Sequence, residues 1–171
     1  VPISESDQHG RGKPLMLSRI AESLFWIGRY IERAEATARI LDVHLQLLVE
    51  DPVLDHDATC RSLLAAMAVA HEGPATTDDV LRLLLVDQEA PTSIAHAIWQ
   101  DRENARRSRE IVSIELWEAI NTTYLAVNRG KLGRMRPADA FRLVRERANL
   151  IAALADNTQS HDDGWQFIKL G

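Results

Sequence analysis

The stretch from Ser18 to Leu48, SRIAESLFWIGRYIERAEATARILDVHLQLL, decides the fold of this chain. Its apolar side chains recur at alternating spacings of four and three residues, which is the period of one buried helix face. They are Ile20, Leu24, Ile27, Ile31, Ala34, Ala38, Leu41, Leu45 and Leu48. Ser18 is the predicted N-cap, because its hydroxyl can accept a hydrogen bond from the first turn. The helix is predicted to end at "EDP", residues 50–52.

Further helices are predicted after this one, separated by Gly, Pro and polar breaks. The predicted ranges are 57–70, 76–87, 92–128 and 137–155, followed by the apolar segment "WQFIKLG". The third range is one bent helix or two helices that meet near residues 109–113. No segment shows the two-residue period of a strand. The fold is therefore predicted to be an all-α, antiparallel bundle of six or seven helices over residues 15–171. Residues 1–14 are predicted to be a flexible leader, native or vector-derived.

The composition excludes several classes of function. Apolar residues make up 46% of the 171 residues, enough for a buried core, and the net charge is −5 with both signs mixed along the chain. No basic run predicts nucleic-acid or membrane binding, and no run of about 18 apolar residues predicts a membrane span. Cys60 is the only cysteine, so an internal disulfide is excluded and a cytoplasmic location is expected.

The first helix carries a dense array of charges. Arg29 is expected to pair with Glu32 at i+3, and Glu35 with Arg39 at i+4, each pair contributing about 0.2–0.5 kcal/mol on an exposed face. A solvated, ion-paired face is the simplest interpretation. However, Trp26 shares the charged side, and a glycine inside a helix costs about 1 kcal/mol relative to alanine. Gly28 therefore predicts the close approach of another helix, a backbone or a ligand.

A second charged array, "DRENARRSRE", covers residues 101–110. Asp101, Asn104 and Ser108 fall on the face that is predicted to be buried, and "ELWEAIN", residues 115–121, follows. Buried polar groups need partners, because an unsatisfied one costs about 1–3 kcal/mol, and arginines of the first helix can supply them. The outcome is either a structural polar network or a carboxylate–guanidinium pocket for an anionic or amide-bearing ligand.

The motifs of common catalytic sites are missing from the sequence. No histidine has a glutamate three residues before it, as a di-iron bundle requires, and neither His-Glu-x-x-His nor paired cysteines occur. The sequence also lacks a phosphate-binding glycine loop, a nucleophile elbow and a dinucleotide fingerprint. No metal, cofactor or cysteine nucleophile is therefore predicted, and Cys60 is expected to pack within its helix.

Four stretches together resemble the bacterial alpha-E family, a group of helical domains with a Gly-Arg-Tyr-x-Glu-Arg-Ala motif. They are "MLSRIAESLFWIGRYIERAEATARILDVHLQLL", "DRENARRSRE", "ELWEAIN" and "GWQFIKLG", and the resemblance covers residues 15–171. Family members are about twice this length and repeat a similar motif after the last stretch. The resemblance thus implies an N-terminal half that is truncated at the C-terminus. Aligning Gly171 with Gly28 also sets "WQFIKLG" beside "ESLFWIG", which is a weak internal repeat.

The family is associated with circularly permuted ATP-grasp amidoligases and with transglutaminase-like peptidases. The resemblance implies a non-catalytic helical partner of such a protein, which acts in forming or modifying peptide or amide bonds; a homo-oligomer is also considered. The predicted ligand- or partner-binding residues are Trp26, Gly28, Arg29, Tyr30, Glu32, Arg33, Arg39, Asp101, Arg102, Asn104, Arg106, Trp117 and Asn121.

Two alternatives stay open. One is an enzyme that acts on the amide-linked product, with Glu35 or Glu115 as the acid/base and Arg29 or Arg33 as a carboxylate clamp. The other is a purely structural helical module, in which the polar arrays only specify packing.

Overall fold

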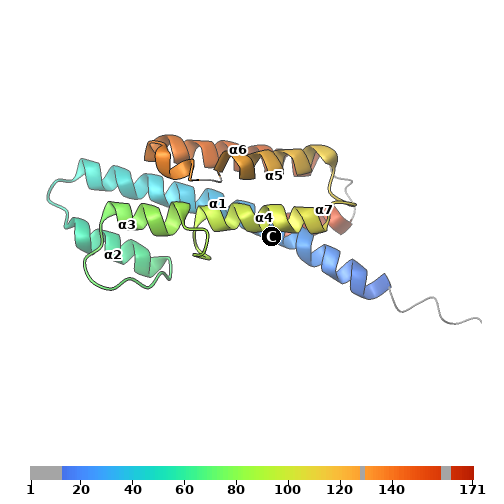
Figure 1. The fold of residues 1–171 in the computed structure, drawn as a ribbon, viewed down its shortest axis with the longest axis horizontal. Helices are drawn as coiled ribbons and strands as arrows, with labels where there is room; N and C mark the ends of the chain where they lie inside the picture. Colours follow the sequence, from blue (N-terminus) through green and yellow to red (C-terminus); the bar gives the residue numbers. More distant parts are fainter. Residues whose placement is uncertain (1–12, 128–129, 159–162) are drawn as a thin grey trace, which may run out of the picture.

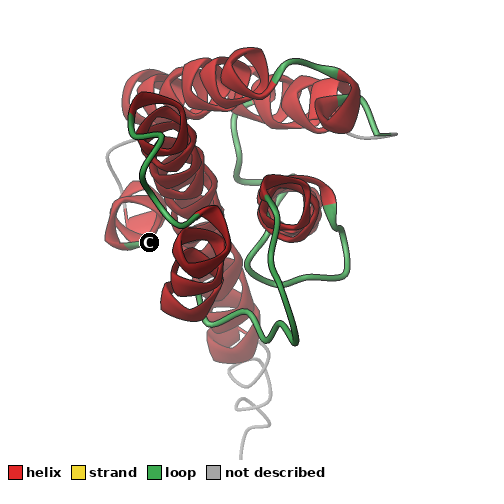
Figure 2. Ribbon diagram, turned by 90° about the vertical axis from the view of Figure 1, so that its left-hand side faces the viewer, coloured by secondary structure: helices red, strands yellow, loops and turns green. Residues whose placement is uncertain are grey.

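A computed structural model describes residues 13–127, 130–158 and 163–171 of the chain. These residues form seven α-helices and no strand, which confirms the predicted all-α class (Figure 1 and Figure 2). Most of the predicted leader, residues 1–12, lies outside the described residues. So do parts of two predicted loops, residues 128–129 and 159–162.

Four long helices form the body of the molecule, and each packs antiparallel against the next (Figure 1). In spatial order they are α1 (Lys13–Glu50), α4 (Ile94–Arg107), α5 (Ile114–Val127) and α6 (Pro137–Thr158), which returns to α1. Three shorter helices complete the fold: α2 (His56–Ala66), α3 (Thr77–Leu81), which continues as a π-helical segment (Arg82–Val86), and α7 (Asp163–Leu170). A 3₁₀ turn (Leu132–Arg134) lies between α5 and α6. α7 packs on α1 and runs in the same direction.

The first helix starts earlier than its sequence indicated. α1 begins at Lys13, so the prediction that Ser18 is its N-cap is wrong. Pro14 suits the first turn, where its missing N–H group would have no helical partner in any case. The predicted apolar stripe is buried along the helix, except that Ile20 and Leu45 are half-buried and pack against the edge of the core. The end of the helix at Glu50 is confirmed.

The second helix ends at Ala66, four residues before the predicted end at Ala70. Ala68 takes a left-handed conformation with φ of 56°, and the next amide, that of Val69, donates to the Leu64 carbonyl at 2.8 Å. This closing turn satisfies carbonyl groups at the helix end. Gly73 and Pro74, the predicted terminators, therefore lie beyond a break that no glycine marks.

We expect the substitution Ala68→Gly to stabilise the protein. A left-handed residue with a Cβ costs roughly 1–2 kcal/mol, and glycine removes that cost while adding some freedom to the unfolded chain. The net gain should be about 1 kcal/mol in the free energy of unfolding, measured by urea denaturation. Ala66→Gly, inside the helix, is the control and should lower stability instead; equal effects of the two substitutions would contradict the interpretation.

Side-chain caps define the next two helix starts. Thr76 and Asp79 form a capping box, in which each side chain bonds the backbone N–H of the other residue. Bonds from the Thr76 hydroxyl and backbone and from Arg82 lower the pKa of Asp79 to about 2. Ser93 caps α4 by accepting from the His96 amide at 3.0 Å. Both caps lie within one residue of the predicted helix starts at residues 76 and 92.

The long segment without Gly or Pro forms two helices, which settles the alternative left open by the sequence. α4 ends at Arg107, and the amide of its C-cap residue, Ser108, still bonds the Asn104 carbonyl at 3.1 Å. Five residues later, the Ser113 hydroxyl accepts from the Leu116 amide at 3.2 Å and starts α5. Two serines thus supply the break that glycine or proline usually supplies.

Candidate functional site

Gly28 lies where α1 and α7 touch backbone to backbone. A Cβ added to Gly28 would stand 2.0 Å from the Ile168 carbonyl oxygen, which no side chain can tolerate. A Cβ added to Gly171, at the end of α7, would likewise overlap the Phe25 carbonyl oxygen. In each case the carbonyl belongs to the residue three positions before the opposite glycine, so the crossing is reciprocal. The predicted close approach at Gly28 is therefore made by α7 itself.

The charges of the motif lie on the surface of α1. We define the ER face as Arg29, Glu32 and Arg33. Arg29 and Glu32 pair at 3.6 Å, as predicted, with side chains 53% and 67% exposed. Arg33 stacks over the Tyr30 ring at 5.4 Å and makes a long, 3.4 Å hydrogen bond to the Pro91 carbonyl.

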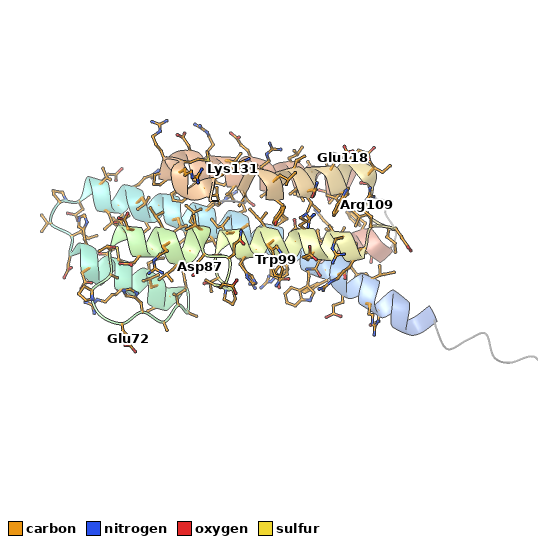
Figure 3. All side chains as sticks on the ribbon, viewed as in Figure 1. Glu72, Asp87, Trp99, Arg109, Glu118 and Lys131 are labelled. Atoms are coloured by element: carbon orange, nitrogen blue, oxygen red, sulfur yellow. The ribbon has the colours of Figure 1, made fainter. Side chains whose placement is uncertain are left out.

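A second group of predicted residues lines a cleft of about 660 Å³ between the first half of α1 and the end of α4. We call it the arginine cleft. Its lining comprises Arg19, Ile20, Glu22, Ser23, Trp26 and Tyr30 of α1, Gln100, Asn104, Arg106 and Arg107 of α4, and Arg109 and Glu110. Figure 3 labels Arg109 at this end of the bundle. Trp26 and Tyr30 stack at 5.3 Å between ring centroids, so two flat rings stand beside the arginines.

Three buried polar residues follow one another on the face of α4 beside this cleft. Asp101, Asn104 and Ser108 are 1%, 6% and 2% exposed, as the sequence predicted. Asn104 donates its amide to the Gln100 carbonyl at 2.8 Å. The Asp101 Oδ1 and Ser108 Oγ atoms have no hydrogen-bond partner among the described residues. Burial raises the pKa of the Asp101 carboxyl well above its ordinary value.

The expected partnership between these groups and the arginines of α1 is wrong for Asp101. The Asp101 Oδ1 atom has no hydrogen-bond partner among the described residues, and Arg33 contacts the Pro91 carbonyl and the Tyr30 ring instead. The reason lies in the helix surface. Arg29 and Arg33 belong to the exposed ER face of α1, whereas Asp101 is enclosed by the apolar faces that join the helices.

The arginine of "DRENAR" instead joins α4 to α5. The Arg102 Nε atom donates to Asn121 Oδ1 at 2.9 Å, and its guanidinium bonds Glu103 at 3.1 Å. The same guanidinium lies over the Tyr124 ring at 4.8 Å and the Trp117 ring at 5.9 Å. The Nε and Nη1 atoms of Arg102 bond partners within the protein and its guanidinium covers two rings of α5, so this cluster is an internal link between two helices.

The two candidate acid/base residues lie on different helices. The Glu35 carboxylate accepts two hydrogen bonds from Arg39, at 2.6 and 3.1 Å, as the predicted i+4 pair. Glu115 is exposed in the first turn of α5. Glu35 borders a second cleft of about 470 Å³ between α1, α6 and α7, and Glu115 borders none of the described clefts. Of the predicted set, Trp26, Tyr30, Asn104 and Arg106 meet in the arginine cleft.

Sequence reasoning missed several residues of the site. Arg19, Glu22, Arg107, Arg109 and Glu110 line the arginine cleft but carry no motif spacing that singles them out. The sequence does contain four arginines between residues 102 and 109, the last of them in a turn, and this local concentration of positive charge could have indicated the site.

A buried pair in α1 and α2 was missed as well. His44 Nε2 lies 3.8 Å from Cys60 Sγ, and both residues are buried. Cys60 therefore contacts α1 rather than packing only within its own helix. Burial lowers the pKa of His44 and raises the pKa of the Cys60 thiol, so both groups favour their neutral forms. A neutral thiol is a weak nucleophile, and the pair serves packing.

Two further kinds of site, a metal centre and a membrane span, depend on side-chain grouping and on helix apolarity. Within residues 13–127, 130–158 and 163–171, no group of three or more His, Cys, Asp or Glu side chains is placed to hold a metal ion. Among the helices in that part of the chain, none combines the length and apolarity that a membrane span requires.

Comparison with known proteins assigns the chain to one family. Neither the curated proteins nor the solved structures gave a significant match. Residues 16–171 match the family model Alpha-E, described as "a predicted alpha-helical domain with a conserved ER motif". Glu32 and Arg33 of the ER face are the Glu-Arg pair that follows Gly28-Arg29-Tyr30. With nearly the whole chain matched and the all-α fold in place, the chain belongs to the Alpha-E family.

Proposed function

We propose that this domain is a non-catalytic partner-binding module of an ATP-grasp amidoligase system that forms or modifies peptide or amide bonds. The observation that carries the proposal is the position of the ER motif. Glu32 is 67% exposed at its side chain, and Arg33 is half-buried against Tyr30. The family description names a conserved ER motif, which we identify with Glu32-Arg33 because this pair completes the Gly-Arg-Tyr-x-Glu-Arg-Ala pattern. Conserved charges on a surface favour binding over packing.

Stability alone does not account for the motif. The Arg29–Glu32 pair is exposed and longer than an ideal ion pair, so it contributes a few tenths of a kcal/mol at most. Other residues of the same motif already pack this stretch into the core. Ile31 and Ala34 are buried, and Gly28 allows the close approach of α7. The weak Arg29–Glu32 pair leaves the exposed Glu32 carboxylate available for a contact outside the domain, beside Arg33, which already contacts Tyr30 and Pro91.

The proposal is tested by binding to a purified ATP-grasp amidoligase from the same bacterium, measured by biolayer interferometry. We expect the double substitution Glu32→Ala/Arg33→Ala to weaken binding at least about tenfold, a loss typical of charged interface residues. Its melting temperature should stay close to that of the unmodified protein. Arg142→Ala is the control, because Arg142 is similarly exposed, at 63%, and also pairs with acidic neighbours on its own helix.

Two results would count against this function. One is an absence of binding to the amidoligase, with a transglutaminase-like peptidase tested in parallel as the other candidate partner. The second is equal affinity of the double variant and the Arg142→Ala control, which would place the contact on another surface.

A further inference from the structure

The arginine cleft has the size of a small-molecule site. Its volume of about 660 Å³ falls within the range of typical ligand pockets, about 300–1,000 Å³. The ER face lies outside it, because neither Glu32 nor Arg33 is part of the lining. An occupant of the cleft is thus a separate question from the partner of the ER face.

Positive charge converges on the cleft from separate parts of the chain. Arg106 and Arg107 lie in the last turn of α4, where the helix dipole favours cations and explains their presence. The dipole does not explain Arg19, which comes from α1, or Arg109, which comes from the turn after α4. Like charges repel each other, so an arrangement that gathers four guanidinium groups favours an anion between them.

Only some of these arginines form an ion pair or a ring contact with other side chains of the described residues. Glu103 holds Arg106 through two hydrogen bonds, at 2.9 and 3.1 Å, and Arg109 lies over the Trp117 ring at 5.2 Å. Arg19 and Arg107 form no ion pair with a carboxylate in the described part of the chain. Their donors are free to form bidentate hydrogen bonds with a carboxylate.

The cleft also carries negative charge and flat apolar surface. Glu22 and Glu110 line it, and neither is ion-paired with a cation among residues that the structure describes. The stacked rings of Trp26 and Tyr30 offer a platform for a planar or apolar group. Asn104, fixed by its bond to the Gln100 carbonyl, adds an amide to the wall.

We propose that the arginine cleft binds a small acidic peptide. Its carboxylates would meet the guanidinium groups of Arg19 and Arg107, its ammonium group would meet Glu22 or Glu110, and an apolar or aromatic side chain would lie against Trp26 and Tyr30. The two glutamates separate this class from nucleotides. A nucleotide also brings an anion and a flat ring, but it has no cation to offset two carboxylates beside it.

The test is a titration of the full chain with glutamyl-phenylalanine, followed through the Trp26 indole signal in proton–nitrogen NMR spectra. Its N-acetyl derivative, its C-terminal amide and adenosine monophosphate are titrated in parallel. We expect saturation by the free dipeptide at millimolar or lower concentration, and weaker binding by the other three compounds because each lacks one of the matching charges. Arg19→Ala/Arg107→Ala should weaken dipeptide binding about tenfold or more.

Arg142→Ala is again the control and should bind the dipeptide as the unmodified protein does. Arg19 and Arg107 are exposed, so the double variant should keep its fold, which circular dichroism checks. Three results would overturn the proposal: no saturable shift of the Trp26 signal, equal or tighter binding of adenosine monophosphate, or an unchanged affinity in the double variant. Glu32→Ala should leave dipeptide binding intact, because Glu32 lies outside the lining of the cleft and pairs with Arg29. This result separates the inference from the function proposed for the ER face.

Discussion

Replacing Gly28 by alanine is expected to release α7 from α1. The added methyl group would stand 2.0 Å from the Ile168 carbonyl oxygen, and a backbone atom cannot rotate away as a side chain can. Undocking exposes Ile168, now 6% exposed, at a cost of about 1.5–3 kcal/mol, while alanine returns about 1 kcal/mol of helix propensity. We expect amide protection in α7 to be lost and global stability to fall by about 0.5–2 kcal/mol.

Hydrogen exchange of the α7 amides measures this effect directly. Gly171→Ala should give the same local loss, because its Cβ would overlap the Phe25 carbonyl oxygen. Gly133→Ala is the matched control, since its Cβ would meet only a Val86 methyl group at an ordinary 3.4 Å. Full protection of α7 in Gly28→Ala would show that α7 stays docked on α1 despite the added methyl group, and would contradict the crossing described here.

Raising the pH is expected to destabilise the protein relative to the variant Asp101→Asn. Burial raises the folded-state pKa of Asp101, whereas in the unfolded chain it titrates near 3.8. Above pH 3.8 the unfolded state therefore releases a proton that the folded state keeps. The free energy of unfolding should fall with rising pH, by up to about 1.4 kcal/mol per unit, until the folded-state pKa is passed.

Urea denaturation of both proteins between pH 4 and pH 8 tests this linkage. The difference in unfolding free energy between Asp101→Asn and the unmodified protein should grow in favour of the variant as pH rises. Infrared spectra provide a second measurement, since a protonated carboxyl band should persist in the unmodified protein at pH values where an ordinary aspartate is ionised, and should be missing in the variant. Parallel stability curves together with no such band would mean that Asp101 is ionised and has a partner.

The long helix was predictable because its burial is one-sided. One face of α1 packs against α4, α6 and α7. The spacing of Leu24, Ile27 and Ile31 on that face is therefore enough to predict the helix and its buried side. Helix ends depend on single backbone conformations instead. The left-handed turn at Ala68 contains no glycine that would indicate it in the sequence. Likewise, Ser108 and Ser113 separate α4 from α5 without a glycine or proline. Periodicity therefore missed the end of α2 at Ala66 and left the break near residues 109–113 as one of two alternatives.

The candidate site was predictable only in part, for a similar reason. Pairs such as Glu35–Arg39 are local, so their spacing alone places them correctly. The arginine cleft depends on how far α4 extends beside α1 and on where the turn after it points. Only the folded chain brings Arg19 and Arg109 to one wall. Likewise, the burial of Asp101 follows from its helix face, but the absence of a partner for its Oδ1 follows from three-dimensional packing.

The reciprocal crossing of α1 and α7 also constrains how such a sequence can evolve. When two side chains collide, a smaller residue at one position can compensate for a larger residue at the other, and the two positions covary. Here each glycine faces a carbonyl oxygen, which every residue possesses, so no substitution at position 168 or 25 can make room. In an alignment of relatives, positions 28 and 171 should therefore each be invariant glycine, with no covariation between either position and the residues it touches.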